Sequence, residues 1–320
     1  MKKKFINSEV IEGYVYQHKL EEKTVQNTSS ANFGKEFING SLFIATDEEG
    51  LNVVEVHYSY VTPNTKVGQP NKTYTTLKAI MAGPTWVGNG KDAATKVKAQ
   101  PSIAVNDFYD REGNLVTAKR NEGGFISIVN SINPDEKQRA TFTTDIVITT
   151  VKRIEADEEK HIAEDYDEIR GVVFNFRGDI IPVDFKIRNQ EGMTYFEDLG
   201  ASPSEPVFTK VWGKIVSETT RVTFEEKTAF GEPSVRTVER TTKEYLVTGA
   251  SADIGEFDTE ETITREELSK AQQDRNIHLA EVKKNQDEYA ASKNVGKDFE
   301  GVKAESAPVT VKKSTDNFVF

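Results

Sequence analysis

The 320-residue chain contains no cysteine, only 3 methionines and 2 tryptophans, and no long apolar run. The lack of cysteine excludes disulfide scaffolds, thiol catalysis and zinc–thiolate sites. No stretch approaches the roughly 20 apolar residues that a membrane-spanning helix requires. The basic start MKKKFINSEV is followed by no apolar segment, so it does not predict a signal peptide. We therefore expect a soluble protein that stays in the cell that makes it.

Catalytic and metal-binding motifs are lacking as well. The four histidines are far apart and none has a metal-ligand spacing: His18, His57, His161 and His278. Neither a GxSxG nor an HExxH motif occurs. Carboxylate runs at residues 47–49 and 157–159 suit solvated turns better than a divalent-cation site. We predict no enzyme, no metal and no cofactor.

Negative charge exceeds positive charge, with 52 Asp and Glu against 41 Lys and Arg. The formal net charge is −11 and the isoelectric point about 5.1, and the chain has no compact basic cluster apart from its basic start. This balance argues against a protein that coats duplex DNA through a large basic surface. The negative net charge is nevertheless compatible with a local basic groove in an otherwise acidic protein.

The same order of elements occurs twice along the chain. Residues 54–60 alternate apolar or aromatic with polar side chains, and residues 181–188 repeat this period of two, which is typical of a half-buried strand. Each alternating strand closes a hairpin, at residues 41–61 and 171–188. Each hairpin is preceded by an opening strand and followed by a short helix and two further strands. These flanking segments are residues 9–20, 73–83, 102–110 and 115–129 in the first unit, and 141–155, 192–202, 207–218 and 234–249 in the second.

This order is that of the oligonucleotide/oligosaccharide-binding (OB) barrel, with five strands and a helix between the third and fourth. We predict a mainly β protein with two tandem OB-like five-stranded barrels, at residues 1–137 and 138–250. Residues 251–320 are expected to form an acidic linker, a polar helix with a capping box at Thr264 and Glu267, and a flexible tail. The alternative fold is a single large β-sandwich with inserted helices.

Aromatic and basic side chains along these strands suit single-stranded nucleic acid. Bases stack on aromatic rings while Lys and Arg contact phosphates, and each stacked base contributes on the order of 1–3 kcal/mol. The candidate binding residues are Phe43, His57, Tyr58, Tyr60, Lys72, Lys119, Arg120, Phe125, Arg177, Lys186, Arg188, Lys210, Trp212 and Lys214. Stacking is assigned above all to Trp212, Tyr58 and Tyr60.

Alternation sorts some of these residues by face. Phe185 shares a face with Val183 and Ile187, which predicts a core position, whereas Lys186 and Arg188 fall on the opposite face. In FTKVWGKI, residues 210, 212 and 214 share one face. An exposed tryptophan between two lysines would suit base stacking; the alternative is a core tryptophan with lysines that extend around it.

Tandem OB-like units followed by a charged tail resemble the single-stranded DNA-binding proteins of replication systems, particularly those of bacteriophages. The segments NGSLFIATDEEGLNVVEVHYSYVT and NDFYDREGNLVTAKRNEGGF are similar to segments of such phage proteins. The resemblance implies sequence-tolerant binding of single-stranded DNA in replication or recombination, in a host bacterial cytoplasm. It also implies that the tail, through Asp316, Phe318 and Phe320, recruits partner proteins.

Two other functions remain open at this point. The first is a phage structural or host-interaction protein whose β domains bind other proteins. The second is a carbohydrate-binding module, which the lysines beside Trp212 disfavour. Oligomeric state and preference for DNA or RNA do not follow from the sequence.

Overall fold

Alternating side chains build the strands, as the sequence predicts. In β3 (Val53–Val61) Val54 and Val56 are buried while Glu55 and His57 face outward. In β8 (Ile180–Ile187) the same period buries Phe185, so its predicted core position is confirmed. The chain is seen in a computed structural model that describes residues 4–110, 112–157, 162, 164–226, 234–252, 254–255, 257–259 and 262–294.

The first five strands close into one barrel. They are β1 (Asn7–Thr24), β2 (Glu36–Ala45), β3, β4 (Lys96–Tyr109) and β5 (Leu115–Ile128). Pairing runs β1–β2–β3–β5–β4 and returns to β1, with β3 and β5 parallel and the other pairs antiparallel. The helices α1 (Lys72–Ala82) and α2 (Trp86–Asn89) and a 3₁₀ turn, η1 (Lys91–Ala93), lie between β3 and β4. This is the OB order.

The next five strands repeat the order. They are β6 (Ala140–Ile154), β7 (Tyr166–Phe174), β8, β9 (Val207–Glu226) and β10 (Ser234–Ala250), preceded by the 3₁₀ turn η2 (Glu136–Gln138), and α3 (Gln190–Asp198) lies between the third and fourth. Pairing runs β6–β7–β8–β10–β9 and returns to β6, with β8 and β10 parallel. The mainly β, two-barrel fold class is therefore confirmed, and two closed barrels are inconsistent with one large sandwich.

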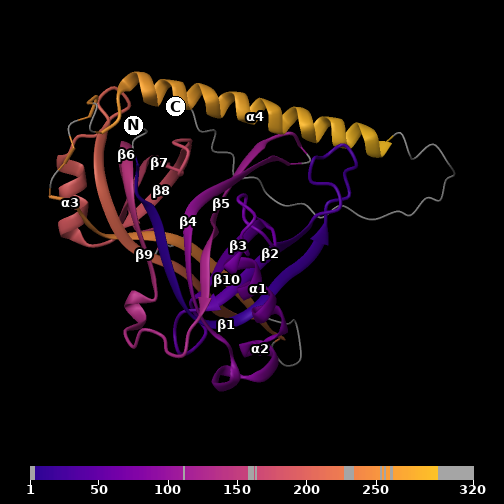
Figure 1. Cartoon of the computed structure of the whole chain (residues 1–320). Helices are drawn as coiled ribbons and strands as arrows, with labels where there is room; N and C mark the ends of the chain where they lie inside the picture. Colours follow the sequence, from indigo (N-terminus) through magenta and orange to yellow (C-terminus); the bar gives the residue numbers. More distant parts are fainter. Residues whose placement is uncertain are drawn as a thin grey trace.

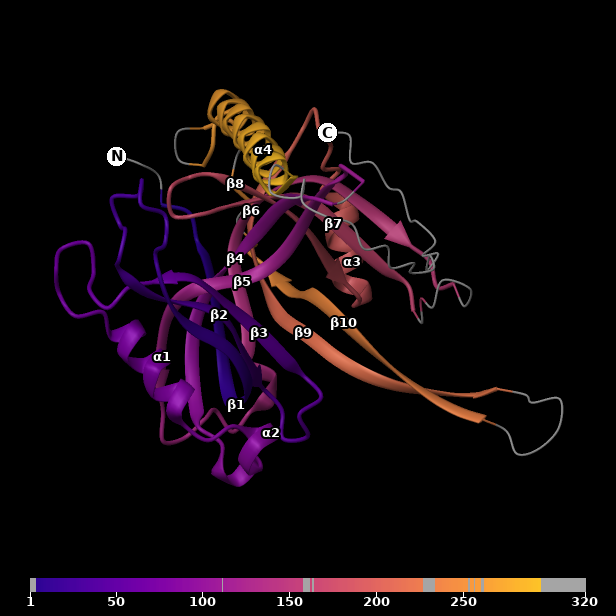
Figure 2. The same cartoon turned by 90° about the vertical axis from the view of Figure 1, so that its right-hand side faces the viewer.

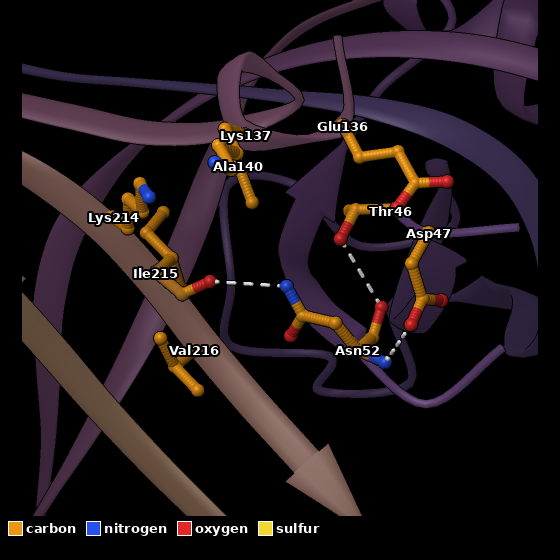
Figure 3. A pocket seen from close by; sticks show the side chains of 9 residues that line it. All are labelled: Thr46, Asp47, Asn52, Glu136, Lys137, Ala140, Lys214, Ile215 and Val216. Carbon is orange, nitrogen blue, oxygen red and sulfur yellow. Dashed lines mark hydrogen bonds between the residues drawn. The ribbon is translucent and has the colours of Figure 1, made fainter. Parts of the chain in front are cut away.

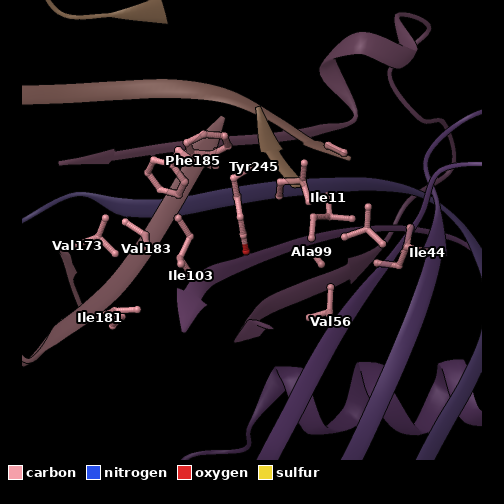
Figure 4. Packing of buried hydrophobic residues seen from close by; sticks show 14 of the residues in the cluster. Ile11, Ile44, Val56, Ala99, Ile103, Val173, Ile181, Val183, Phe185 and Tyr245 are labelled. Carbon is pink, nitrogen blue, oxygen red and sulfur yellow. The ribbon is translucent and has the colours of Figure 1, made fainter. Parts of the chain in front are cut away.

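The barrels are joined through β1, whose first residues pair with β6 from Asn7↔Thr144 to Ile11↔Ala140. One hydrophobic core consequently runs through both barrels. Figure 4 shows Tyr245 of β10 between the side chains of the two barrels. Its ring packs edge-on against Phe142 and tilted against Phe185, at 5.4 and 5.6 Å between centroids.

The helix α4 (Arg265–Asn294) lies across both barrels like a strap (Figure 1). Its capping box is confirmed: the backbone N–H of Glu267 donates to Thr264 Oγ1 at 3.1 Å, and that of Thr264 donates to Glu267 Oε2 at 2.9 Å. On the first barrel, Arg275 forms a two-pronged ion pair with Asp107. No described helix combines the length and apolar character needed to cross a membrane.

Beyond the second barrel, β9 and β10 continue as a two-stranded ribbon that extends away from the molecule (Figure 2). The pairing runs out to Glu226↔Ser234. The predicted tail residues Asp316, Phe318 and Phe320 lie outside the described residues. The division of the chain at residues 137/138 and 250/251 stays a prediction.

Candidate nucleic-acid interface

The outer face of β2 and β3 in the first barrel carries aromatic and polar side chains. Ser41 and His57 are cross-strand neighbours, with 3.2 Å between Oγ and Nδ1. Beside them, the ammonium of Lys19 lies 5.7 Å from the centre of the Phe43 ring. At the end of the strands, the rings of Phe37 and Tyr60 pack at 4.7 Å. In OB barrels this second–third strand face binds oligonucleotides.

The equivalent face of the second barrel lies on β7 and β8. The ammonium of Lys186 lies 4.6 Å from the centre of the Tyr166 ring, a cation–π contact. The carboxylate of Glu244, on the neighbouring strand β10, accepts from Lys186 Nζ at 2.6 Å and from Arg188 NH2 at 2.5 Å. Arg188 Nε also lies 3.1 Å from Glu164. Each barrel thus presents a cation beside an aromatic ring on the same face.

A cleft between the barrels borders both faces: Glu55 of β3 lines it, and so does Glu244, the partner of Lys186 and Arg188. We call it the junction cleft; it has a volume of about 260 Å³ and is lined by Val54, Glu55, Lys119, Arg120, Asn121, Ile215, Val216, Ser217, Lys243, Glu244 and Tyr245. Contacts cross it in both directions. Lys119 of the first barrel pairs with Asp184 of the second, and Lys243 of the second pairs with Glu55 of the first at 3.2 Å.

A buried network of three polar side chains lies at the bottom of this cleft. The hydroxyl of Tyr245 is 2.6 Å from Asn121 Oδ1 and 3.0 Å from Glu9 Oε1. The amide of Asn121 donates in turn to the carbonyl of Glu55 at 2.7 Å. Burial raises the pKa of the Glu9 carboxyl to about 8, because an ionised carboxylate is poorly solvated there. The network links β1, β5 and β10.

Trp212 lies on a different face from the residues above. It sits on β9 with Lys210 and Lys214, its indole packs over Gly249 of β10, and 41% of its surface is exposed. Of the two alternatives for Trp212, an exposed ring and a core ring, the exposed ring is therefore the correct one.

Lys214 reaches a second, smaller pocket, of about 180 Å³, between the barrels (Figure 3). There the side chain of Asn52 donates to the carbonyl of Ile215 at 3.3 Å and accepts from the N–H of Ser217 at 2.7 Å. The side chain of Asn52 thereby fixes β9 of the second barrel against the first.

The other predicted residues are scattered. Tyr58 is fully buried, so its predicted stacking position is wrong: it follows Val54 and Val56 in the alternation and packs in the core. Phe125 is exposed on β5. Lys72 begins α1, and Arg177 lies over the ring of Phe176 in the β7–β8 turn. Phe125, Lys72 and Arg177 do not line the junction cleft.

Sequence reasoning missed several residues on the two faces. Tyr166 follows a polar stretch that reads as a loop, and Lys19 comes late in a long first strand. Lys243 and Glu244 lie in the segment that predicts the last strand, but their sequence pattern indicates no binding role for them. Their spacing in the sequence carries no signal, because only the closing of the second barrel brings β10 beside β8, and only the docking of the two barrels brings Lys243 beside Glu55 of β3.

The family model described as YorF matches residues 7–285. No curated protein matches the chain. A deletion mutant of the single-stranded DNA binding protein from Thermus aquaticus is similar in structure at 11% identity and a TM-score of 0.45, over 81% of this chain and 99% of that one.

A replication protein A heterotrimer bound to single-stranded DNA is also similar, at 10% identity and a TM-score of 0.20, over 77% of this chain and 66% of that one. Likenesses this distant carry no function over to the chain.

Proposed function

The chain belongs to the YorF family, and we propose that it binds single-stranded DNA without strong sequence preference. The proposal is supported above all by one observation. In each of two OB barrels the second–third strand face carries a cation beside an aromatic ring, and a cleft lined by β3, β5, β9 and β10 lies between the barrels.

The chemistry of the two faces suits a flexible polyanion. On the first barrel, Phe43 and His57 offer rings for stacking, and Lys19 offers a nearby ammonium. On the second, Tyr166 offers the ring, and Lys186 and Arg188 offer donors to phosphates. Every base has a π-face, so stacking on these rings tolerates any sequence.

The strand would cross the junction cleft between the two faces. Lys119, Arg120 and Lys243 line the cleft and are positioned to contact phosphates there. Lys210, Trp212 and Lys214 would extend the contact along β9, and Tyr60, Lys72, Phe125 and Arg177 would add outlying contacts. We also propose that the protein is phage-encoded and acts in DNA replication or recombination. Its tail would recruit partner proteins through Asp316, Phe318 and Phe320.

Fluorescence anisotropy with a labelled oligo-dT of about 30 nucleotides tests the proposal. We expect binding at low salt that weakens as salt rises, with a log–log slope of about −0.7 for each phosphate neutralised. The absence of binding at low salt would refute it and favour the alternative, a module that binds other proteins.

A pair of aromatic variants places the site. Tyr166→Ala should weaken oligo-dT binding by about 1–3 kcal/mol, because it removes a stacking ring. Phe108→Ala is the matched control: that ring is 38% exposed on β4, a strand that carries none of the proposed contacts, and its removal should leave affinity unchanged. Equal effects of the two substitutions would contradict the assignment of the β7–β8 face.

A further inference from the structure

Several cations of the proposed interface are already paired with acidic residues within the protein. Lys119 pairs with Asp184, Lys186 pairs with Glu244, and Arg188 pairs with both Glu244 and Glu164. Three cations therefore meet three carboxylates on the second barrel's side of the cleft. A surface selected for phosphate attraction alone would not carry this many acids.

Glu244 is the central acid of this group. Its side chain is only 5% exposed, whereas Lys186 and Arg188 remain 27% and 34% exposed. The carboxylate is thus almost covered, whereas the two cations that contact it remain partly exposed to solvent. A lysine has three donors and an arginine five, so both can still donate to a phosphate while they bond to Glu244. Glu244 cancels one of their two positive charges, and Glu164 offsets the other.

We infer that Glu244 and Asp184 are specificity-determining residues that favour single-stranded over double-stranded DNA. This inference rests on the proposed function. Duplex DNA is attracted through its phosphates, and its bases are stacked on one another and cannot stack on Tyr166. A single strand retains the stacking contribution when the phosphate attraction is reduced. Neutralising the cations therefore weakens duplex binding more than single-strand binding.

Backbone flexibility acts in the same direction. A single strand can adjust its phosphates to the few donors that Glu244 leaves available on Lys186 and Arg188. A duplex presents phosphates at fixed spacing and depends on the long-range charge of the surface. With Glu244 present, that charge is small on the β7–β8 face.

The test compares two ligands on the full chain: oligo-dT of about 30 nucleotides and a duplex of the same length. Glu244→Gln keeps a hydrogen-bond acceptor of similar shape and removes the charge. We expect duplex affinity to rise about tenfold, the effect of one added charge-assisted contact. Single-strand affinity should rise about threefold or less, so the ratio of the two affinities falls. The duplex salt slope should steepen by about 0.9 for each phosphate gained.

Controls separate this effect from net charge and from misfolding. Glu191→Gln removes the same charge from the exposed first turn of α3 and should leave the ratio unchanged. Asp184→Asn, at a more exposed carboxylate, should lower the ratio in the same way as Glu244→Gln, and it decides the outcome if a thermal melt shows the Glu244 variant unfolded. An unchanged ratio in a folded variant, or an equal fall with Glu191→Gln, would overturn the inference. A wild-type chain that binds neither ligand would instead refute the proposed function.

Discussion

Glu9 is expected to hold a proton at neutral pH, and the hydrogen bonds around it require this. The side-chain amide of Asn121 donates to the carbonyl of Glu55, which leaves its Oδ1 to accept from Tyr245. The tyrosine hydroxyl has one proton, and the Asn121 bond uses it. Glu9 Oε1, 3.0 Å from the same hydroxyl, must then be the donor, and only a carboxylic acid can donate. The other oxygen, Oε2, has no hydrogen-bond partner among the described residues.

A raised pKa makes the stability depend on pH with a defined sign. The pKa of Glu9 rises from 4.5 in the unfolded chain to about 8 in the fold, so between these values the folded chain binds the proton and the unfolded chain releases it. The free energy of unfolding therefore falls as pH rises through this window, by about 1.4 kcal/mol per pH unit at most. The contribution is fully present below pH 4.5 and is lost above pH 8, a total on the order of 5 kcal/mol.

Urea unfolding of the wild type and of Glu9→Gln at several pH values between 5 and 8 measures this contribution. Glutamine is neutral at every pH and can donate from its amide to Tyr245, so the variant should lack the slope that Glu9 causes. We expect similar midpoints near pH 5 and a variant that is more stable than the wild type near pH 8. Parallel curves over the whole range would show that Glu9 is ionised in the fold and would refute the reasoning.

Two further predictions concern the exposed tryptophan and the C-terminal strap. Trp212→Ala should weaken oligo-dT binding by about 1–3 kcal/mol and leave the melting temperature nearly unchanged, because the ring is 41% exposed; a large loss of stability in the melt would mean that the ring is structural. Arg275→Ala should lower the free energy of unfolding by about 3 kcal/mol, because it leaves the carboxylate of Asp107, at 4% exposure, with the hydroxyl of Thr117 but without its cationic partner. Hydrogen exchange should then become faster in α4 than in β6, and equal protection in both would contradict the role of the pair.

The fold could be predicted from the sequence further than the site could. Period-two alternation and the repeated order of elements predict the ten strands and the two OB-like units of the described residues. They can do so because each signal lies within a few neighbouring residues. Tyr58 illustrates the limit. Its aromatic ring predicts a stacking role, but it continues the alternation of Val54 and Val56, and that period places it in the core, where the structure has it.

The site is set by contacts between segments far apart in the sequence. Lys119 meets Asp184 and Lys243 meets Glu55 only after both barrels have closed and docked. No local pattern encodes those pairs. The basic residues of the second barrel were found from the sequence, since they alternate along β8. The acids that neutralise them, above all Glu244, were not, because they lie on another strand.

The connection through β1 bears on whether the two barrels are independent. Asn7 to Ile11 come first in the sequence, yet they pair with β6 of the second barrel, and Ile11 is fully buried in the shared core. A fragment that begins at residue 138 would lose this pairing and would expose the edge of β6. It would also lose Glu9 and Asn121, the partners of the buried Tyr245 hydroxyl. An unpaired buried hydroxyl costs on the order of 1–3 kcal/mol. The cleft between the barrels therefore depends on the intact chain, and a strand bound across it would contact one surface made by both.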